Sequence, residues 1–76
     1  MKIIVHLAGI ARDLAGKENI SIEIVNSEHL YDVISASIPG LENFYFLISI
    51  NGRIANNHSL MKEEDNILVF SPTAGG

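Results

Sequence analysis

The hydrophobic positions of this chain alternate with polar ones in two early segments, and this spacing predicts strands. Residues 2–8 and 19–25 are rich in β-branched side chains with a period of two, so we expect two half-buried strands paired as a hairpin. Residues 9–16 between them predict a helical connection of one to two turns that Gly16 ends. Ile4 and His6 should face away from the core. The side chains expected to face the core are Ile3, Val5, Leu7, Ile20, Ile22 and Ile24.

A helix is predicted over residues 28–38, because its apolar side chains recur at helical spacing and Pro39-Gly40 then ends it. Asn26-Ser27 offers an N-cap, and Glu28 carries the charge that a helix N-terminus favours. The expected apolar face consists of Leu30, Val33, Ile34, Ser37 and Ile38, and Tyr31 and Asp32 are expected on the solvent side.

The second half of the chain predicts three more strands. Residues 46–50 and the short segment 53–55 flank Asn51-Gly52, which is a strong signal for a two-residue hairpin. A polar loop follows, in which His58 should be exposed, and the apolar residues 67–70 predict a final buried strand. Phe44 and Tyr45, in the loop 41–45, are expected to cover the edge of the core.

This order of elements favours an α+β fold in which one helix crosses over one face of a mixed sheet of four to five strands. A crossover of this length allows a strand to return parallel to the first one and insert beside it. The other face of the sheet then stays open, and apolar residues left on it, such as Ile4 and Phe70, are candidates for a docking patch.

Composition and charge exclude several classes of site and disfavour several classes of partner. The 76 residues make one small domain with no cysteine, which excludes a disulfide framework, a thiolate metal site and a side-chain thiol nucleophile. The net charge of −4 disfavours nucleic acid and suits a basic surface on a protein partner. The histidines are scattered, so no metal site is expected. His6 interrupts the apolar start and Arg12-Asp13 follow it, which favours a cytoplasmic protein with no membrane contact over a secreted one.

The sequence finishes in Ser71-Pro72-Thr73-Ala74-Gly75-Gly76. At a usual glycine content of roughly 7%, two final glycines arise by chance only about 0.5% of the time. We therefore expect a domain over residues 1–70 and a flexible tail over 71–76 whose working group is the carboxylate of Gly76. Because glycine has no Cβ, such a tip fits a channel too narrow for side chains.

Three segments together resemble the molybdopterin synthase small subunit, a family that shares a ubiquitin-like β-grasp fold with the sulfur carriers of the thiamine pathway. They are residues 7–16, Ile50-Asn51-Gly52 and residues 65–76, and the resemblance covers essentially the whole chain. Its most specific part is an aromatic residue, Phe70, followed by a proline-containing turn and the final Gly-Gly.

The resemblance implies a carrier that is not itself a catalyst and binds no permanent cofactor. An E1-like adenylyltransferase would use ATP to adenylate the Gly76 carboxylate, and a sulfurtransferase would supply the sulfur of a thiocarboxylate. The large synthase subunit, expected to form a heterotetramer with this chain, would take up the tail and use the sulfur to build the dithiolene of molybdopterin. The implied site consists of Gly76, the tail residues Pro72, Thr73, Ala74 and Gly75, and the partner-binding residues Phe70 and Arg12.

Two departures from the family bear on the pathway. Ser71 replaces the first of two prolines, which should loosen the start of the tail, and Glu64-Asp65 lacks the glycine of the usual Asp-Gly-Asp turn. Pro72 still favours the molybdopterin branch over the thiamine branch. A protein modifier conjugated through Gly76 and a plain binding module stay open as alternatives. A stand-alone enzyme is disfavoured because the serines have no evident base and no phosphate-binding glycine loop is present.

Overall fold

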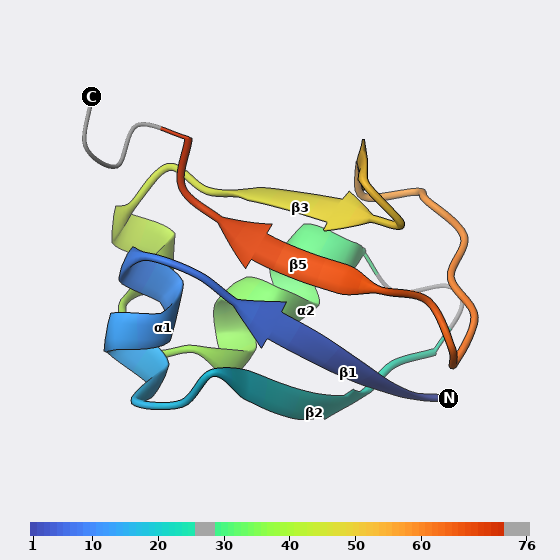
Figure 1. Ribbon diagram of the computed structural model, residues 1–76, viewed down its shortest axis with the longest axis horizontal. Helices are drawn as coiled ribbons and strands as arrows, with labels where there is room; N and C mark the ends of the chain where they lie inside the picture. The colour runs from blue at the N-terminus through green and yellow to red at the C-terminus, as the bar shows by residue number, and fades with distance from the viewer. Residues whose placement is uncertain (26–28, 73–76) are drawn as a thin grey trace.

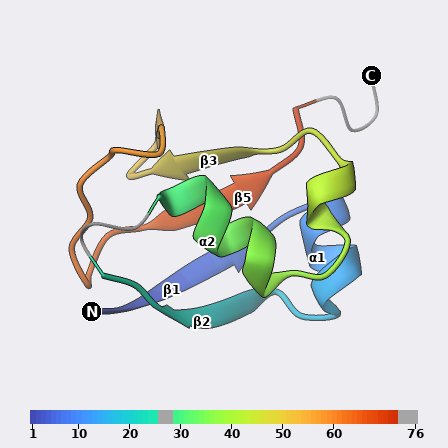
Figure 2. The same ribbon diagram turned by 180° about the vertical axis from the view of Figure 1, so that it is seen from behind.

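A mixed sheet forms one layer of the protein, and helix α2 packs across one of its faces (Figures 1 and 2). The computed structural model describes residues 1–25 and 29–72, and in these residues the sheet has five strands in the order β2-β1-β5-β3-β4. The strands are β1 Lys2–Leu7, β2 Asn19–Glu23, β3 Leu47–Ile50, β4 Arg53–Ile54 and β5 Ile67–Phe70. The helices are α1 Ile10–Ala15, α2 Leu30–Ser37 and the 3₁₀ turn η1 Leu41–Asn43.

The first two strands form the expected antiparallel hairpin, although β2 ends at Glu23 rather than at residue 25. Helix α1 joins them and ends where expected. Gly16 has the left-handed conformation, with φ of 71°, and its N–H donates to the carbonyl oxygen of Arg12 at 2.9 Å. Glycine adopts this conformation without a Cβ clash, so the chain turns back at once into β2.

The last strand, β5, lies in the middle of the sheet. It pairs in parallel with β1, with Val5 opposite Ile67, and antiparallel with β3, with Leu47 opposite Phe70. The expectation of a strand that returns parallel to the first one is therefore confirmed for β5. Because both its neighbours are strands, the backbone of β5 is held on both edges up to Val69, and Phe70 is paired with β3 alone.

Helix α2 supplies the other half of the core. It begins at Leu30, with His29 as N-cap, whereas the expected start at residue 28 and the capping residues Asn26, Ser27 and Glu28 lie outside the described residues. Of its expected apolar face, Val33 is half-buried and Ser37 is exposed. The buried core lies between α2 and the sheet and consists of Ile3, Val5, Leu7, Ala11, Ile22, Ile24, Leu30, Ile34, Ile38, Leu41, Ile48, Ala55, Ile67 and Val69.

The expected solvent position of Tyr31 is wrong, while that of Asp32 is confirmed. The Tyr31 ring stacks on Phe46 with a centroid separation of 5.5 Å, and its hydroxyl lies against the backbone of β3 and of Ala55. Tyrosine combines a large apolar ring with a polar end. The ring packs between the helix and the sheet while the hydroxyl bonds to the backbone there, so the side chain does not face solvent.

The expected covering role of Phe44 and Tyr45 is also wrong, because their side chains are 45% and 64% exposed. The 3₁₀ turn before them places Leu41 in the core, and Phe46, after them, takes the inward position beside Tyr31. The two aromatics are therefore displayed on the surface.

The predicted hairpin at Asn51-Gly52 is confirmed. Both residues have positive φ, 53° and 85°, as the two central residues of a type I′ turn require. Beyond it, Asp65 closes the polar loop without the glycine of the family pattern: its carboxylate accepts a hydrogen bond of 2.8 Å from the backbone N–H of Lys62. Within the described residues, no helix combines the length and apolarity that a membrane span needs.

Candidate functional site

The C-terminal segment leaves the sheet from its central strand. Phe70 is the last residue of β5, and the N–H of Ala8 still donates to the carbonyl oxygen of Val69 at 2.9 Å just before the strand ends. Figure 1 shows the chain leaving β5 at the end of the molecule where α1 lies, away from the hairpin that joins β3 to β4. A segment that begins here is attached to the most firmly held strand of the domain.

Ser71 is tied to the neighbouring loop. Its hydroxyl donates a hydrogen bond of 3.0 Å to the carbonyl oxygen of Tyr45. This hydrogen bond restrains Ser71 in place of a proline ring, and the expectation that serine loosens the start of the tail stays a prediction. Pro72 is exposed, and Thr73, Ala74, Gly75 and Gly76 lie outside the described residues. Their proposed roles stay predictions.

Phe70 lies on the face of the sheet opposite α2. The side chains of Ile67 and Val69 are buried on the face of the sheet that α2 covers. Leu68 and Phe70 alternate with them along β5, and their side chains are half-buried on the other face. Residues directly opposite each other in a ladder point to the same face. The open-face patch, as we call it, consists of Ile4, Leu47, Ile54, Leu68 and Phe70.

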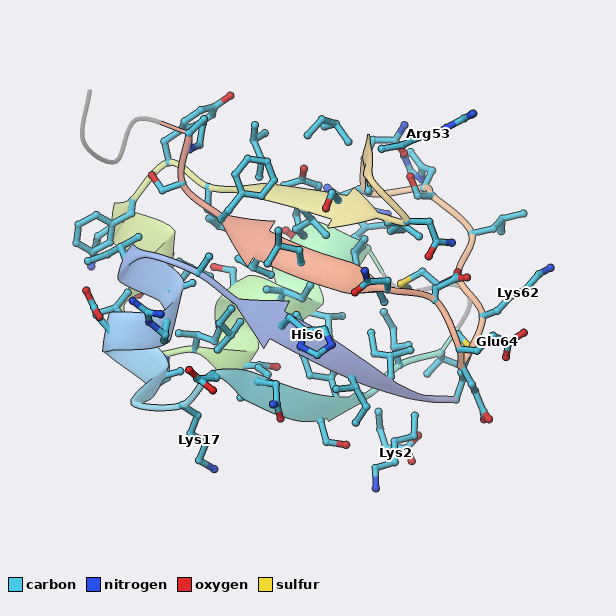
Figure 3. All side chains as sticks on the ribbon, viewed as in Figure 1. Lys2, His6, Lys17, Arg53, Lys62 and Glu64 are labelled. Atoms are coloured by element: carbon cyan, nitrogen blue, oxygen red, sulfur yellow. The ribbon has the colours of Figure 1, made fainter. Side chains whose placement is uncertain are left out.

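His6 lies on the same face, and Figure 3 shows its ring over β1 on the side of the sheet that carries no helix. Ile4 and His6 therefore face away from the core, as expected. Exposed apolar residues next to one another on a sheet face are typical of protein contacts.

Arg12 lies on α1, which contacts β5. Its side chain is exposed, and it makes no ion pair within residues 1–25 and 29–72. Of the other basic side chains, Lys2, Arg53 and Lys62 lie toward the opposite end of the molecule, and Lys17 lies just after α1, on the side of that end away from the tail (Figure 3). Arg12 therefore carries a positive charge near the base of the tail, and its contact with a partner stays a prediction.

Two of the histidines lie together in the part of the chain that the structure describes. His29 and His58 meet edge to face with ring centroids 5.2 Å apart, and His29 lies 3.4 Å from the carboxylate of Asp32. No group of three or more potential ligands there is arranged to hold a metal ion. The exposed position expected for His58 is confirmed.

Solved structures of similar shape connect this geometry to known proteins. A crystal structure of small archaeal modifier protein 1 from Haloferax volcanii superposes with a TM-score of 0.79 at 18% identity, over 100% of both chains. A putative molybdopterin converting factor, subunit 1, from Pyrococcus furiosus superposes with a TM-score of 0.79 at 22% identity, over 96% of this chain and 99% of that one. The chain has a ubiquitin-like β-grasp fold. No protein family and no curated protein matches the sequence.

Sequence reasoning missed the part of the site formed by residues 44–46. The sequence around Phe44 and Tyr45 shows no alternation of hydrophobic and polar residues. It therefore does not distinguish an aromatic side chain on the surface from one that covers the core. The bond from Ser71 to Tyr45 joins residues 26 positions apart, so local spacing contains no sign of it. The hairpin signal at Asn51-Gly52 fixes the register of β3 against β4 and not against β5, so it gives no sign of this contact either.

Proposed function

We propose that this β-grasp domain is a sulfur carrier whose Gly76 carboxylate is adenylated and converted to a thiocarboxylate. The observation that carries the proposal is the position of the tail. The segment that begins at Ser71 and finishes in Gly75-Gly76 follows Phe70, the last residue of the central strand β5. The fold itself is shared with a modifier and a converting-factor subunit.

The chemistry explains why a bare backbone end is useful. A carboxylate is a poor acyl electrophile, and transfer of the AMP group of ATP to it releases pyrophosphate and creates a good leaving group. A sulfur nucleophile then attacks the acyl carbon and AMP leaves. Where this nucleophile is the outer sulfur of a persulfide on the sulfurtransferase, the product is an acyl disulfide. A thiol then attacks the inner sulfur, so that the donor leaves as a disulfide and the outer sulfur stays on Gly76 as a thiocarboxylate, which an enclosing partner shields from water. This domain contributes the surface that partners recognise and a tail long enough to enter their active sites, while an E1-like adenylyltransferase and a sulfurtransferase contribute catalysis.

Within this class, we propose molybdopterin synthesis as the pathway, with this chain as the small subunit of the synthase. Pro72 after the aromatic Phe70 supports this branch, and so does the similarity in shape to the converting-factor subunit. The large subunit would receive the tail, with the open-face patch and Arg12 as its contacts on the domain. A carrier of the thiamine type shares the same chemistry and differs in the acceptor of the sulfur.

A second function, conjugation of Gly76 to lysines of other proteins, is favoured by one specific observation. One of the similar structures, which covers all of this chain and is itself covered in full, belongs to a protein whose name is that of a modifier. Both functions begin with the same acyl-adenylate and separate only at the nucleophile that displaces AMP, which is sulfur in one case and an amine in the other.

Intact-mass measurement separates these functions. The purified protein is incubated with the adenylyltransferase, ATP and a sulfur donor, and the carrier proposal expects the mass gain of one oxygen exchanged for sulfur at Gly76. The control is a variant lacking Gly76. Adducts of higher mass that survive reduction and require Gly76 would favour the modifier, and a protein that gains neither sulfur nor adducts would contradict both.

A further inference from the structure

The loop before β3 and the base of the tail form one surface. In the ladder between β3 and β5, Leu47 lies opposite Phe70, so residues 46 and 45 continue the same register toward Ser71 and Pro72. The Ser71 hydroxyl bond to the Tyr45 carbonyl oxygen, 3.0 Å long, holds the two segments together beyond the last paired residues.

Two large aromatics are displayed at this point. Phe44 and Tyr45 are adjacent in sequence and are 45% and 64% exposed, and Pro72, the residue after the Ser71 that bonds to Tyr45, is exposed too. Scattered single apolar residues on a surface need no explanation, but aromatic neighbours at the base of a functional segment are the residues that protein contacts favour. We call Phe44, Tyr45 and Pro72 the aromatic collar.

Because the tail is short, any protein that acts on Gly76 must come close to the collar. Four residues follow Pro72 in the sequence, and fully extended they span at most about 14 Å. A partner whose active site holds the Gly76 carbonyl carbon must therefore have its entrance within that distance of Pro72, so this entrance meets the collar.

We propose that the aromatic collar is a contact for the adenylating partner, and that Ser71 is the positioning residue that keeps the collar beside the tail. The inference rests on the proposed function, because it assumes that Gly76 is activated. An apolar rim around the channel entrance is the partner chemistry that fits exposed phenyl and phenol rings. Ser71 acts through the Tyr45 carbonyl and touches no reacting atom.

The test compares two double variants in which exposed apolar residues become serine. Phe44→Ser/Tyr45→Ser removes the collar. Val25→Ser/Leu60→Ser removes side chains that are 63% and 87% exposed and that belong neither to the collar nor to the open-face patch. Both variants should melt at the temperature of the unmodified protein, since no core residue changes.

The readout is ATP–pyrophosphate exchange by the adenylyltransferase at varied carrier concentration. The collar variant should raise KM for the carrier by at least about tenfold with kcat unchanged, because the affected contact is made before and during the reaction alike. The Val25→Ser/Leu60→Ser variant should keep the KM of the unmodified protein. Ser71→Ala should raise KM by a smaller factor, and Ser71→Thr, which keeps the hydroxyl, should restore it.

Equal KM values for the two double variants would overturn the inference, and so would a fall in kcat at constant KM. A Ser71→Thr variant as impaired as Ser71→Ala would overturn the positioning role. If the unmodified protein is never adenylated, the proposed function itself fails, and the inference fails with it. The experiment thus separates the two failures.

Discussion

The hydroxyl of Tyr31 donates a hydrogen bond of 2.8 Å to the carbonyl oxygen of Ala55, and this bond extends the pairing of β3 with β4 through a helix side chain. The same hydroxyl accepts a hydrogen bond of 3.1 Å from the N–H of Ile48. Ala55 donates its own N–H to the carbonyl oxygen of Ile48 at 2.7 Å, so the phenol oxygen takes the place of the reciprocal ladder bond. Tyr31 thereby locks α2 to the sheet.

Replacing Tyr31 by phenylalanine should lower the free energy of unfolding by about 1–3 kcal/mol, because a buried N–H and a buried carbonyl oxygen lose their partner while the ring still packs. Thermal or denaturant unfolding measures this loss. The matched control is Tyr45→Phe, which removes an exposed hydroxyl and should change stability by less than about 0.5 kcal/mol. Equal effects of the two substitutions would contradict the bridging role.

The positions of the strands could be predicted from this sequence because their signals are local. Alternating buried apolar residues mark β1, alternating isoleucines mark β2, and the two residues of a type I′ turn mark the hairpin of β3 and β4. The place of Tyr31 could not, since its partners Ile48 and Ala55 lie 17 and 24 positions away in the sequence. Helical periodicity assigns a face, but it does not show that a neighbouring strand end reaches around to meet that face.

The same limit applied to the candidate site. The tail is visible in the sequence because its composition is local, and Phe70 follows from the alternation in β5. Whether serine loosens the tail depends on an acceptor in the loop before β3. That acceptor, the Tyr45 carbonyl oxygen, becomes a neighbour of Ser71 only after β5 inserts between β1 and β3.

Acid should weaken the loop before β5 through Asp65. The backbone N–H of Lys62 and the side-chain amide of Asn51 donate to this carboxylate and hold the pKa of Asp65 below its ordinary value. A lowered folded-state pKa contributes stability above the unfolded value, about 3.9, and that contribution is lost as pH falls through the lower folded-state pKa.

Unfolding of Asp65→Asn at neutral pH and at acid pH tests this directly. The variant should be less stable than the unmodified protein at neutral pH, and the difference should shrink as pH falls below about 3.9. Glu64→Gln is the control, because it removes the same charge from the neighbouring exposed position, where the carboxylate holds no hydrogen bond to a described residue. A difference for Asp65→Asn that stays constant with pH would be the contrary result.

Phe70→Ala should weaken binding to the partner that receives the tail by more than about 1 kcal/mol, because a half-buried aromatic on the open-face patch has the exposure and size of an interface anchor. Calorimetric titration with that partner measures the affinity, and a melting curve measures the domain. Leu60→Ala, at an exposed leucine at the other end of the sheet, is the control. Unchanged affinity together with a lower melting temperature would assign Phe70 to the core instead.

Removal of Gly75 and Gly76 should abolish activation while leaving the melting temperature unchanged. Every buried core residue that the structure describes lies between Ile3 and Val69, so we expect the deletion to take nothing from the packing. The shortened chain ends in the carboxylate of Ala74, which is chemically similar but reaches about 7 Å less and carries a Cβ at the tip. Intact-mass measurement after incubation with the adenylyltransferase, ATP and a sulfur donor should show no sulfur on this variant. A variant that still gains sulfur would show that the carboxylate of Gly76 is not the group that is activated.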